Sequence, residues 1–250
     1  MAKVLRLLIL GGTAEARMLA QAAAALEGLD VVTSLAGRTR APRRPEGGLR
    51  VGGFGGVAGL GRYLEEAGID LVVDATHPFA GAISAHGLAA SRQRDLPFLR
   101  LSRPPWAPQP GDRWIEAADA AAAARALPAR ARRVFLAIGQ KDLAAFAGQP
   151  DRWFLLRTVD ALPGPLPFAQ GLAVTGRGPF DLAAERALLV AHRIEALVSR
   201  NSGGDASAAK LAAARELALP VVMIARPTVP TAPEVASAAE ALLWLRRHLG

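Results

Sequence analysis

The 250-residue sequence contains no cysteine. This absence excludes disulfide bonds, thiolate catalysis and cysteine-ligated zinc or iron–sulfur centres. Histidine is scarce as well: the four histidines are His77, His86, His192 and His248, and no two of them are three or four residues apart. Metal motifs carried on one helix use that spacing, so we expect no metal bound by the protein itself.

Long hydrophobic stretches are also missing. Every apolar run ends well before the roughly 20 residues that a membrane helix needs. The first residues, Met1 to Arg6, lead directly into a predicted strand, so we expect no signal peptide. The sequence therefore predicts a cytoplasmic protein without a membrane segment.

Lysine and aromatic residues are rare. Only three lysines occur, so 27 of the 30 basic residues are arginine, the formal net charge is +8, and aromatic residues make up 5% of the chain. Many arginines together with many alanines are typical of a GC-rich genome. Apart from a cluster in residues 38–50, the arginines are dispersed, which argues against a nucleic-acid partner. A basic chain still attracts small anions such as phosphates or a polycarboxylate.

Apolar runs alternate with alanine-rich helical stretches along almost the whole chain, which indicates an α/β fold. The runs are continuously apolar, as expected for parallel strands covered by helices on both faces of a sheet. We predict strands at 4–10, 31–35, 69–74, 97–101, 134–138, 153–158, 172–175, 196–199 and 221–224. We predict helices near 14–26, 60–67, 79–92, 117–126, 142–146, 181–192, 207–217 and 234–248.

A proline- and tryptophan-rich stretch, residues 103–114, interrupts this alternation and reads as a crossover or linker. The sequence thus predicts two Rossmann-like parallel-sheet domains, an N-terminal one at 1–115 that binds the cofactor and a C-terminal one at 116–250 that contributes to substrate and cofactor binding. The active site is expected in the cleft between them. Ligands of such sheets bind at the carboxyl ends of the strands, so the residues after each strand carry the candidate chemistry.

The first strand is followed by Gly11-Gly12-Thr13-Ala14-Glu15. Two glycines permit a tight turn and a close approach to a phosphate, and the next helix offers unpaired N–H groups. The third glycine of the G-x-G-x-x-G fingerprint is missing. We favour a nucleotide site here over a plain strand-to-helix turn.

The second strand ends in a basic, hydroxyl-bearing segment. No acid occurs between Val31 and Pro45, whereas Ser34, Arg38 and Thr39 are present. An NAD site places an acid here for the ribose 2′-hydroxyl, and a basic segment suits a 2′-phosphate instead. If this is a dinucleotide site, NADP is favoured; the alternative is a solvated basic loop.

The third predicted strand ends in Asp74-Ala75-Thr76-His77-Pro78-Phe79. A histidine at this place is suited to bonding a cofactor, binding a carboxylate or donating a proton. The alternative is that Thr76 caps a helix and His77 packs without a chemical role.

The second half offers two further candidate segments. Arg177 and Gly178 follow one predicted strand, and Arg200-Asn201-Ser202-Gly203-Gly204 follow another, with Lys210 on the next helix. Asn201 is the only asparagine in the chain. Its amide and the two glycines are expected to form a polar ligand site, the alternative being a simple turn residue.

Taken together, these segments resemble the precorrin-6A reductase family of corrin-ring biosynthesis, which includes the cobalt-precorrin-6A reductases. The resemblance extends over essentially the whole chain in family order. The matching motifs are Gly11-Gly12-Thr13-Ala14-Glu15, Ser34-Leu35-Ala36-Gly37-Arg38, Asp74-Ala75-Thr76-His77-Pro78-Phe79-Ala80, Arg103-Pro104-Pro105-Trp106, Arg177-Gly178-Pro179-Phe180 and Asn201-Ser202-Gly203-Gly204.

The resemblance implies an oxidoreductase that uses NADPH, with NADH as a further possibility, to reduce a ring double bond of precorrin-6A and give precorrin-6B in cobalamin biosynthesis. The alternatives are a cobalt-precorrin-6A reductase using NADH and a non-catalytic dinucleotide-binding module. The partner would be a polycarboxylate tetrapyrrole, and the oligomeric state stays open. Cofactor binding is assigned to Gly11, Gly12, Thr13, Ala14, Glu15, Ser34, Arg38, Thr39 and Thr76. Substrate binding is assigned to Arg177, Gly178, Arg200, Asn201, Ser202, Gly203, Gly204 and Lys210. His77 is the candidate proton donor or substrate orienter, with ordered water as the other proton source.

One residue departs from the family pattern. The family commonly has lysine before Asn-Ser-Gly-Gly, whereas this chain has Arg200. Arginine does not readily release a proton, so a general-acid role is disfavoured, and a guanidinium fork suits carboxylate binding. A nucleotide-sugar transferase also fits two Rossmann-like halves, but the second half has no clear acidic constellation.

Overall fold

The computed structural model describes residues 3–37 and 45–250, and its contacts divide the chain into two units. The first unit combines Met1–Pro104 with Thr228–Gly250, and the second is Pro105–Pro227. Each unit contains one six-stranded sheet in which all pairings are parallel. The predicted α/β class with two parallel sheets is confirmed.

The sheet of the first unit has the strand order β12-β5-β4-β1-β2-β3. Chain order reverses between β1 and β4, and this is the switch point at which such sheets bind ligands. The strands are β1 (Leu5–Leu10), β2 (Leu29–Leu35), β3 (Gly48–Val51), β4 (Leu71–Asp74), β5 (Phe98–Leu101) and β12 (Glu234–Val235).

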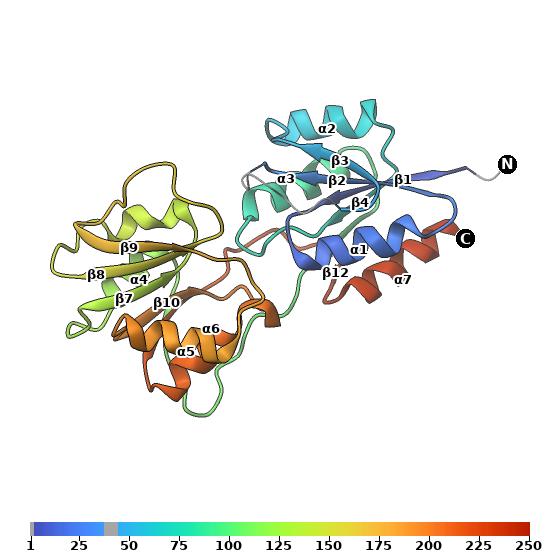
Figure 1. The fold of residues 1–250 in the computed structure, drawn as a ribbon. Coiled ribbons are helices and arrows are strands. Elements are labelled where there is room, and N and C mark those ends of the chain that lie inside the picture. Colours follow the sequence, from blue (N-terminus) through green and yellow to red (C-terminus); the bar gives the residue numbers. More distant parts are fainter. Residues whose placement is uncertain (1–2, 38–44) are drawn as a thin grey trace. The chain divides into compact units, whose positions relative to one another are not determined.

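Helices cover both faces of this sheet (Figure 1). On one face, α1 (Ala14–Ala24) lies beside α7 (Ala238–Leu249), and both bury side chains against Leu7, Ile9 and Val73. On the other face, α2 (Gly56–Glu66) and α3 (Gly81–Arg92) cover the alternate residues of the same strands. The central strands are apolar on both faces because both faces are buried.

The sheet of the second unit has the order β6-β11-β10-β7-β8-β9, so its switch point lies between β7 and β10. The strands are β6 (Arg113–Ala117), β7 (Arg133–Ala137), β8 (Trp153–Thr158), β9 (Gln170–Thr175), β10 (Ala196–Arg200) and β11 (Pro220–Ile224).

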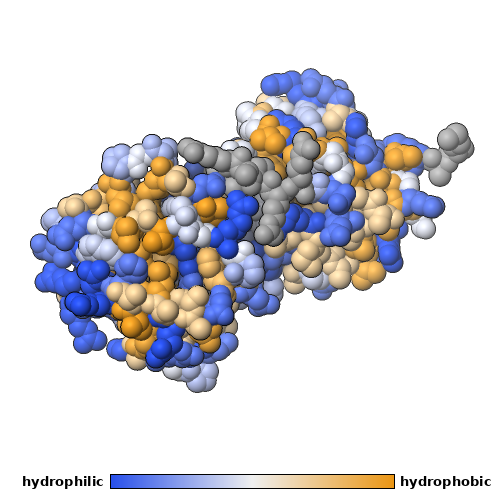
Figure 2. Space-filling model, in the orientation of Figure 1, coloured by the Kyte–Doolittle hydropathy of each residue, from blue (hydrophilic) through white to orange (hydrophobic). Residues whose placement is uncertain are grey.

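The helices of the second unit are α4 (Ala120–Ala126), the 3-10 helix η1 (Gln140–Phe146), α5 (Leu182–Ala191), the short 3-10 turn η2 (Asp205–Ser207) and α6 (Ala209–Glu216). Leu189 of α5 and Leu211 of α6 lie in one apolar core with Phe135 of β7. The edge strand β9 is less covered, and Leu172 on it is 41% exposed. Figure 2 shows apolar residues among polar ones over the visible face of this unit.

The second unit is continuous in the sequence, whereas the first is completed by a segment that follows the second. β6 precedes the other five strands of the second unit, whereas β12 and α7 follow the whole second unit and return to the first. Glu234 of β12 pairs with Arg100 of β5, and α7 packs on α1. The division therefore differs from the expected domains 1–115 and 116–250, because β6 and the C-terminal helix each belong to the unit whose sheet and helices they contact.

Three further elements differ from the expected ones. The segment 37–56 contains β3, which is short and carries glycine, so its sequence resembles a loop. The predicted linker 103–114 runs into β6, and the predicted helix at 234–248 begins as the strand β12. Helix starts were easier to predict: Asp181 caps α5 by accepting a hydrogen bond from the N–H of Ala184, as its side chain suggested.

Candidate functional site

The turn after β1 contains two glycines, and each position requires glycine for a different structural reason. A Cβ on Gly11 would lie 2.8 Å from Cγ2 of Thr33, so close packing against β2 requires the missing side chain. Gly12 has φ +120°, a backbone conformation that side-chain-bearing residues rarely adopt, and no other group of the described chain lies within 4 Å of its Cβ position. The turn at this switch point is therefore tight, and it is open above Gly12.

Thr13 and the start of α1 complete this turn. The Thr13 hydroxyl accepts a hydrogen bond from the N–H of Ala16 at 3.0 Å and donates to the carbonyl of Ala75 at 2.8 Å. Its side chain thus caps the helix and ties it to the end of β4. Glu15 pairs with Arg103 at 2.8 Å. The backbone N–H groups of Ala14 and Glu15 in the first helical turn are the remaining anion-binding donors, because a helix supplies no partners for its first N–H groups.

Ser34, at the end of β2, is buried, and its hydroxyl faces Arg50 of β3. Arg50 was missed as a site residue because it lies in a segment that reads as a loop. Two of the predicted cofactor ligands, Arg38 and Thr39, lie outside the described residues. The structure thus places one predicted group, Ser34, and one unexpected cation at this end of the sheet.

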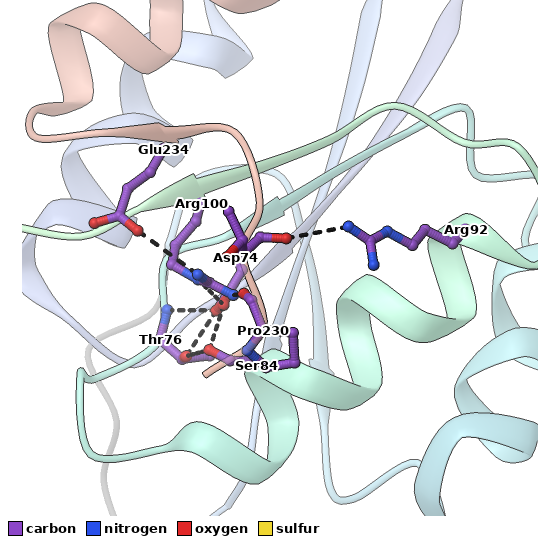
Figure 3. Close-up of polar contacts among 8 residues, drawn as sticks. Asp74, Thr76, Ser84, Arg92, Arg100, Pro230 and Glu234 are labelled. Carbon is purple, nitrogen blue, oxygen red and sulfur yellow. Dashed lines mark hydrogen bonds and ion pairs between the residues drawn. The ribbon is translucent and has the colours of Figure 1, made fainter. Parts of the chain in front are cut away.

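Asp74, the last residue of β4, is fully buried in a polar cluster (Figure 3). Its carboxylate accepts hydrogen bonds from the hydroxyl of Thr76 at 2.7 Å, the N–H of Thr76 at 3.1 Å, and the hydroxyl of Ser84. Nε of Arg100 lies 3.5 Å away. The hydroxyl of Thr76 is therefore bonded within the fold, and any contact of Thr76 with a cofactor stays a prediction.

The same cluster fixes the segment that returns from the second unit. Arg100 donates to the carbonyl of Pro230 at 3.1 Å and lies 3.6 Å from the carboxylate of Glu234. Arg92 of α3 donates to the carbonyl of Thr231 at 3.1 Å (Figure 3). Asp74 thus organises the end of β4, the start of α3 and the entry to β12, which is a structural role next to the switch point.

His77 follows this cluster and is partly exposed. Its Nδ1 accepts a hydrogen bond from the N–H of Phe79 at 3.2 Å, and its ring centroid lies 5.9 Å from that of Phe79. Because Nδ1 accepts, the neutral ring carries its proton on Nε2. The loop thus orients the imidazole with a donor on Nε2, while its role as proton donor stays a prediction.

In the second unit, Arg200 ends β10 at the switch point. Its Nε and Nη2 donate to the same oxygen of Asp142 at 2.9 and 2.5 Å. A Cβ on Gly139, which follows β7, would lie 2.5 to 2.8 Å from the guanidinium. The guanidinium therefore lies directly against the backbone of the turn after β7, and Asp142 and Gly139 are positioning residues that sequence reasoning missed.

Asn201 is bonded to the segment that enters the second unit. Its side-chain oxygen accepts from the N–H of Trp106 at 2.7 Å, and its amide donates to the carbonyl of Trp106 at 3.0 Å. These two hydrogen bonds give Asn201, the only asparagine of the chain, a structural function. Substrate binding by its side chain would require these bonds to open, and it stays a prediction.

The neighbouring candidates surround the same tryptophan. The indole N–H of Trp106 donates to the carbonyl of Gly204 at 3.1 Å, and Nζ of the buried Lys210 lies 4.5 Å from the Trp106 ring and donates to the carbonyl of Ser207 at 2.6 Å. Ser202 is buried, and its carbonyl accepts from Arg226 at 3.1 Å. The structure thus brings Asn201 to Gly204 together with Lys210 around Trp106.

Arg177 and Gly178 lie in the loop after β9. Arg177 is exposed, and a Cβ on Gly178 would lie 2.8 Å from the carbonyl of Ala206 in η2. The N–H of Phe180 donates to the same carbonyl at 3.2 Å. This loop therefore lies against η2, the turn that follows Gly204.

Two kinds of feature, a metal-binding cluster and a membrane-spanning helix, are missing from residues 3–37 and 45–250. No group of three or more His, Asp or Glu side chains there has the arrangement to hold a metal ion. Within the same ranges, no helix combines the length and the apolar character needed to cross a bilayer.

Comparison with known proteins gives consistent matches. A family model described as precorrin-6x reductase CbiJ/CobK matches residues 6–246. A precorrin-6A reductase of Rhodococcus erythropolis is 47% identical over 241 residues, which cover 96% of this chain and 97% of that protein. A solved structure described as CobK precorrin-6A reductase superposes with a TM-score of 0.92 at 46% identity, covering 98% of this chain and 97% of the other. A cobalt-precorrin-6A reductase of Synechocystis is 30% identical over 182 residues, or 68% of each chain.

Proposed function

Because the chain belongs to the precorrin-6x reductase family CbiJ/CobK, we propose that it reduces a ring double bond of precorrin-6A to give precorrin-6B, using NADPH. The observation that carries this proposal is the turn at the first switch point. Gly11 packs against β2, Gly12 is open above, and Thr13 caps the helix whose first N–H groups face the turn. A nucleotide diphosphate is the ligand that this arrangement fits.

The preference for NADPH rests on charge at the ends of β2 and β3. No acid is present between Val31 and Pro45, and Ser34 faces the guanidinium of Arg50. Arg38 and Thr39 follow Ser34 in the sequence. A phosphate on the adenosine ribose would meet cations here, whereas a free 2′-hydroxyl would find no carboxylate acceptor.

For the second unit we propose recognition of the substrate's carboxylates. Arg177 and Arg200 supply guanidinium groups at the carboxyl ends of β9 and β10, and Asp142 fixes the orientation of Arg200. The loops Gly178 and Ser202 to Gly204 supply backbone groups near them. The metal-free substrate is favoured because the precorrin-6A reductase named above is 47% identical and the cobalt-precorrin-6A reductase only 30%.

When bound, the reduced nicotinamide supplies the hydride for this reaction. The residues of the chain orient the two ligands and exclude water. The second substrate carbon needs a proton, for which His77 is the candidate because an imidazolium can donate one near neutral pH; ordered water is the alternative. Arg200 is assigned to binding, because a guanidinium holds its proton at neutral pH.

The test is anaerobic incubation of the full chain with NADPH or NADH and with either metal-free or cobalt precorrin-6A, followed by loss of nicotinamide absorbance and by mass analysis of the tetrapyrrole. Oxidation of NADPH with a two-electron gain in metal-free precorrin-6A is expected. If the nicotinamide is not oxidised in any of these combinations, the reductase activity is contradicted. Binding of NADPH without oxidation supports the non-catalytic module. In the same assay, full turnover by an H77A variant would show that His77 is not the proton donor.

A further inference from the structure

Arg50 is held rigidly at the end of β3. It lies opposite Ser34 in the register of β2 and β3. Nη1 donates to the carbonyl of Gly52 at 2.7 Å and lies 3.4 Å from the Ser34 hydroxyl, and Nη2 donates to the carbonyl of Gly53 at 2.8 Å. Three of its five N–H donors are thus used for fixing the guanidinium.

Aromatic rings fix the plane of the same guanidinium. Its central carbon lies 3.7 Å from the ring centroid of Phe54 and 5.1 Å from that of Tyr63. Arginine stacks well on aromatic faces, so this contact holds the group flat without neutralising its charge. The remaining donors, Nε–H and one Nη2–H, make no hydrogen bond to any residue of the described ranges.

The charge of Arg50 is not balanced by a carboxylate. Its half-buried guanidinium makes no ion pair in the part of the chain that the structure describes, and residues 38–44 contain four arginines and no acid. Three other buried or half-buried guanidiniums are paired with carboxylates, Arg100 with Asp74, Arg157 with Glu185 and Arg200 with Asp142, whereas the half-buried Arg17 and Arg133 also make no ion pair within the described residues. Partial burial of an unbalanced cation is unfavourable, so the position fits a charge that a ligand anion completes.

We propose that Arg50 binds the 2′-phosphate of the cofactor and is the residue that discriminates NADPH from NADH. This inference rests on the proposed function. Two adjacent N–H donors match two oxygens of a phosphate, and the stacked guanidinium needs little reordering on binding. Ser34, in register with Arg50 and at the end of β2, lies on the same side of the sheet, where the adenosine ribose of a dinucleotide is held.

The test uses the full chain and two fragments of the cofactor, adenosine 2′,5′-bisphosphate and 5′-AMP, titrated by calorimetry. The R50Q variant is expected to bind the bisphosphate roughly 10- to 100-fold more weakly, the range for loss of charge-assisted hydrogen bonds, and 5′-AMP within about twofold of the unchanged chain. The R62Q variant removes an exposed arginine of α2 in the same unit and controls for net charge, so it should change neither affinity more than about twofold.

The R50K variant and the comparison of the two fragments test the role of Arg50 further. R50K keeps the charge and loses the planar guanidinium, so it is expected to weaken binding of the bisphosphate and leave binding of 5′-AMP unchanged. It also replaces R50Q if that variant does not fold. Equal effects on both fragments, or no effect on either, overturn the role of Arg50. A chain that binds neither NADPH nor NADH contradicts the proposed function instead, whereas unchanged discrimination in a variant that still binds NADPH contradicts only this inference.

Discussion

In the first unit the strand β4 ends in the buried carboxylate of Asp74, whereas β10, which holds the same sheet position in the second unit, ends in the guanidinium of Arg200. Asp74 is enclosed by Thr76, Ser84 and Arg100 and shapes the fold around it. The side chain of Arg200 is 20% exposed and bonds to Asp142. One strand order therefore supports opposite charges at the same place.

The turns beside these residues differ in the same sense. The space above Gly12 contains no other described group within 4 Å, whereas Gly139, after β7, is covered by the guanidinium of Arg200. The first unit thus keeps the turn that we propose to bind phosphate accessible, and the second fills the corresponding place with its own cation. Shared topology does not imply a shared ligand, because the site depends on the side chains at the strand ends.

The largest expected difference between the units is in the stability lost when the carboxylate of Asp74 or of Asp142 is removed. D74A removes the buried partner of Arg100, which keeps only the half-exposed Glu234 at 3.6 Å, and it is expected to lower the free energy of unfolding by about 3–5 kcal/mol. D142A removes a partner from a partly exposed pair, for which about 1 kcal/mol or less is expected. Urea unfolding followed by circular dichroism measures both. Equal losses would show that the two pairs are energetically alike and would remove this contrast.

The two glycines are expected to separate the ligands. G12A places a side-chain-bearing residue at φ +120°, which costs about 1–3 kcal/mol in the fold, and it should raise the KM for NADPH more than tenfold. G139A displaces the guanidinium of Arg200, and it should raise the KM for the tetrapyrrole by about tenfold, as for one lost charge-assisted contact, with the KM for NADPH unchanged.

G148A is the matched control for these glycine variants, because no group lies within 4 Å of that Cβ position in the described chain and its φ is ordinary. It should alter neither KM. If G12A and G139A raise the KM for the same ligand, the two turns do not bind different ligands and the proposed contrast is wrong.

The smallest effect concerns α7, the helix of the first unit that the chain adds last. Ser237 and Glu240 form its capping box, and hydrogen bonds from the N–H of Ala236 and from the hydroxyl and N–H of Ser237 lower the pKa of the Glu240 carboxyl. S237A should cost about 1 kcal/mol. Because the folded pKa is lowered, the contribution of Glu240 is present above its ordinary pKa and is lost as the pH falls through the lowered one.

E240Q is therefore expected to melt below the unchanged chain at neutral pH and together with it in acid. E66Q, at an exposed acid at the end of α2, is the control and should show no such convergence. A constant difference between E240Q and the unchanged chain across pH would mean that the carboxylate charge does not stabilise the cap.

The sequence predicted what depends on neighbours along the chain. The apolar strands β1, β4 and β7, the turn at Gly11 and Gly12, and the cap at Asp181 all follow from local patterns. β3 and β12 were not predicted, because both are short and depend on pairing with strands far away in the sequence. The expected boundary at 115 differed from the division of the structure for the same reason: the pairing of β12 with β5 is not visible in either segment alone.

The candidate site shows the same limit. The positions of Arg200 and Asn201 after a strand were predictable, but their partners Asp142 and Trp106 are 58 and 95 residues away. Arg50 was hidden in a segment rich in proline, arginine and glycine. The role that we propose for it rests on contacts that only the folded chain brings together, such as those with Ser34 and Phe54.

The late position of β12 and α7 in the sequence also determines the order in which the chain can finish folding during synthesis. When residue 227 has emerged from the ribosome, the second unit has all six of its strands, whereas the first has five and its edge strand β5 lacks a neighbour. The faces of α1 and the sheet that Ala241 and Leu245 cover are still exposed to water at that moment. The unit that is made first is thus completed last, and a premature stop near the C-terminus would damage the N-terminal fold and leave the second unit whole.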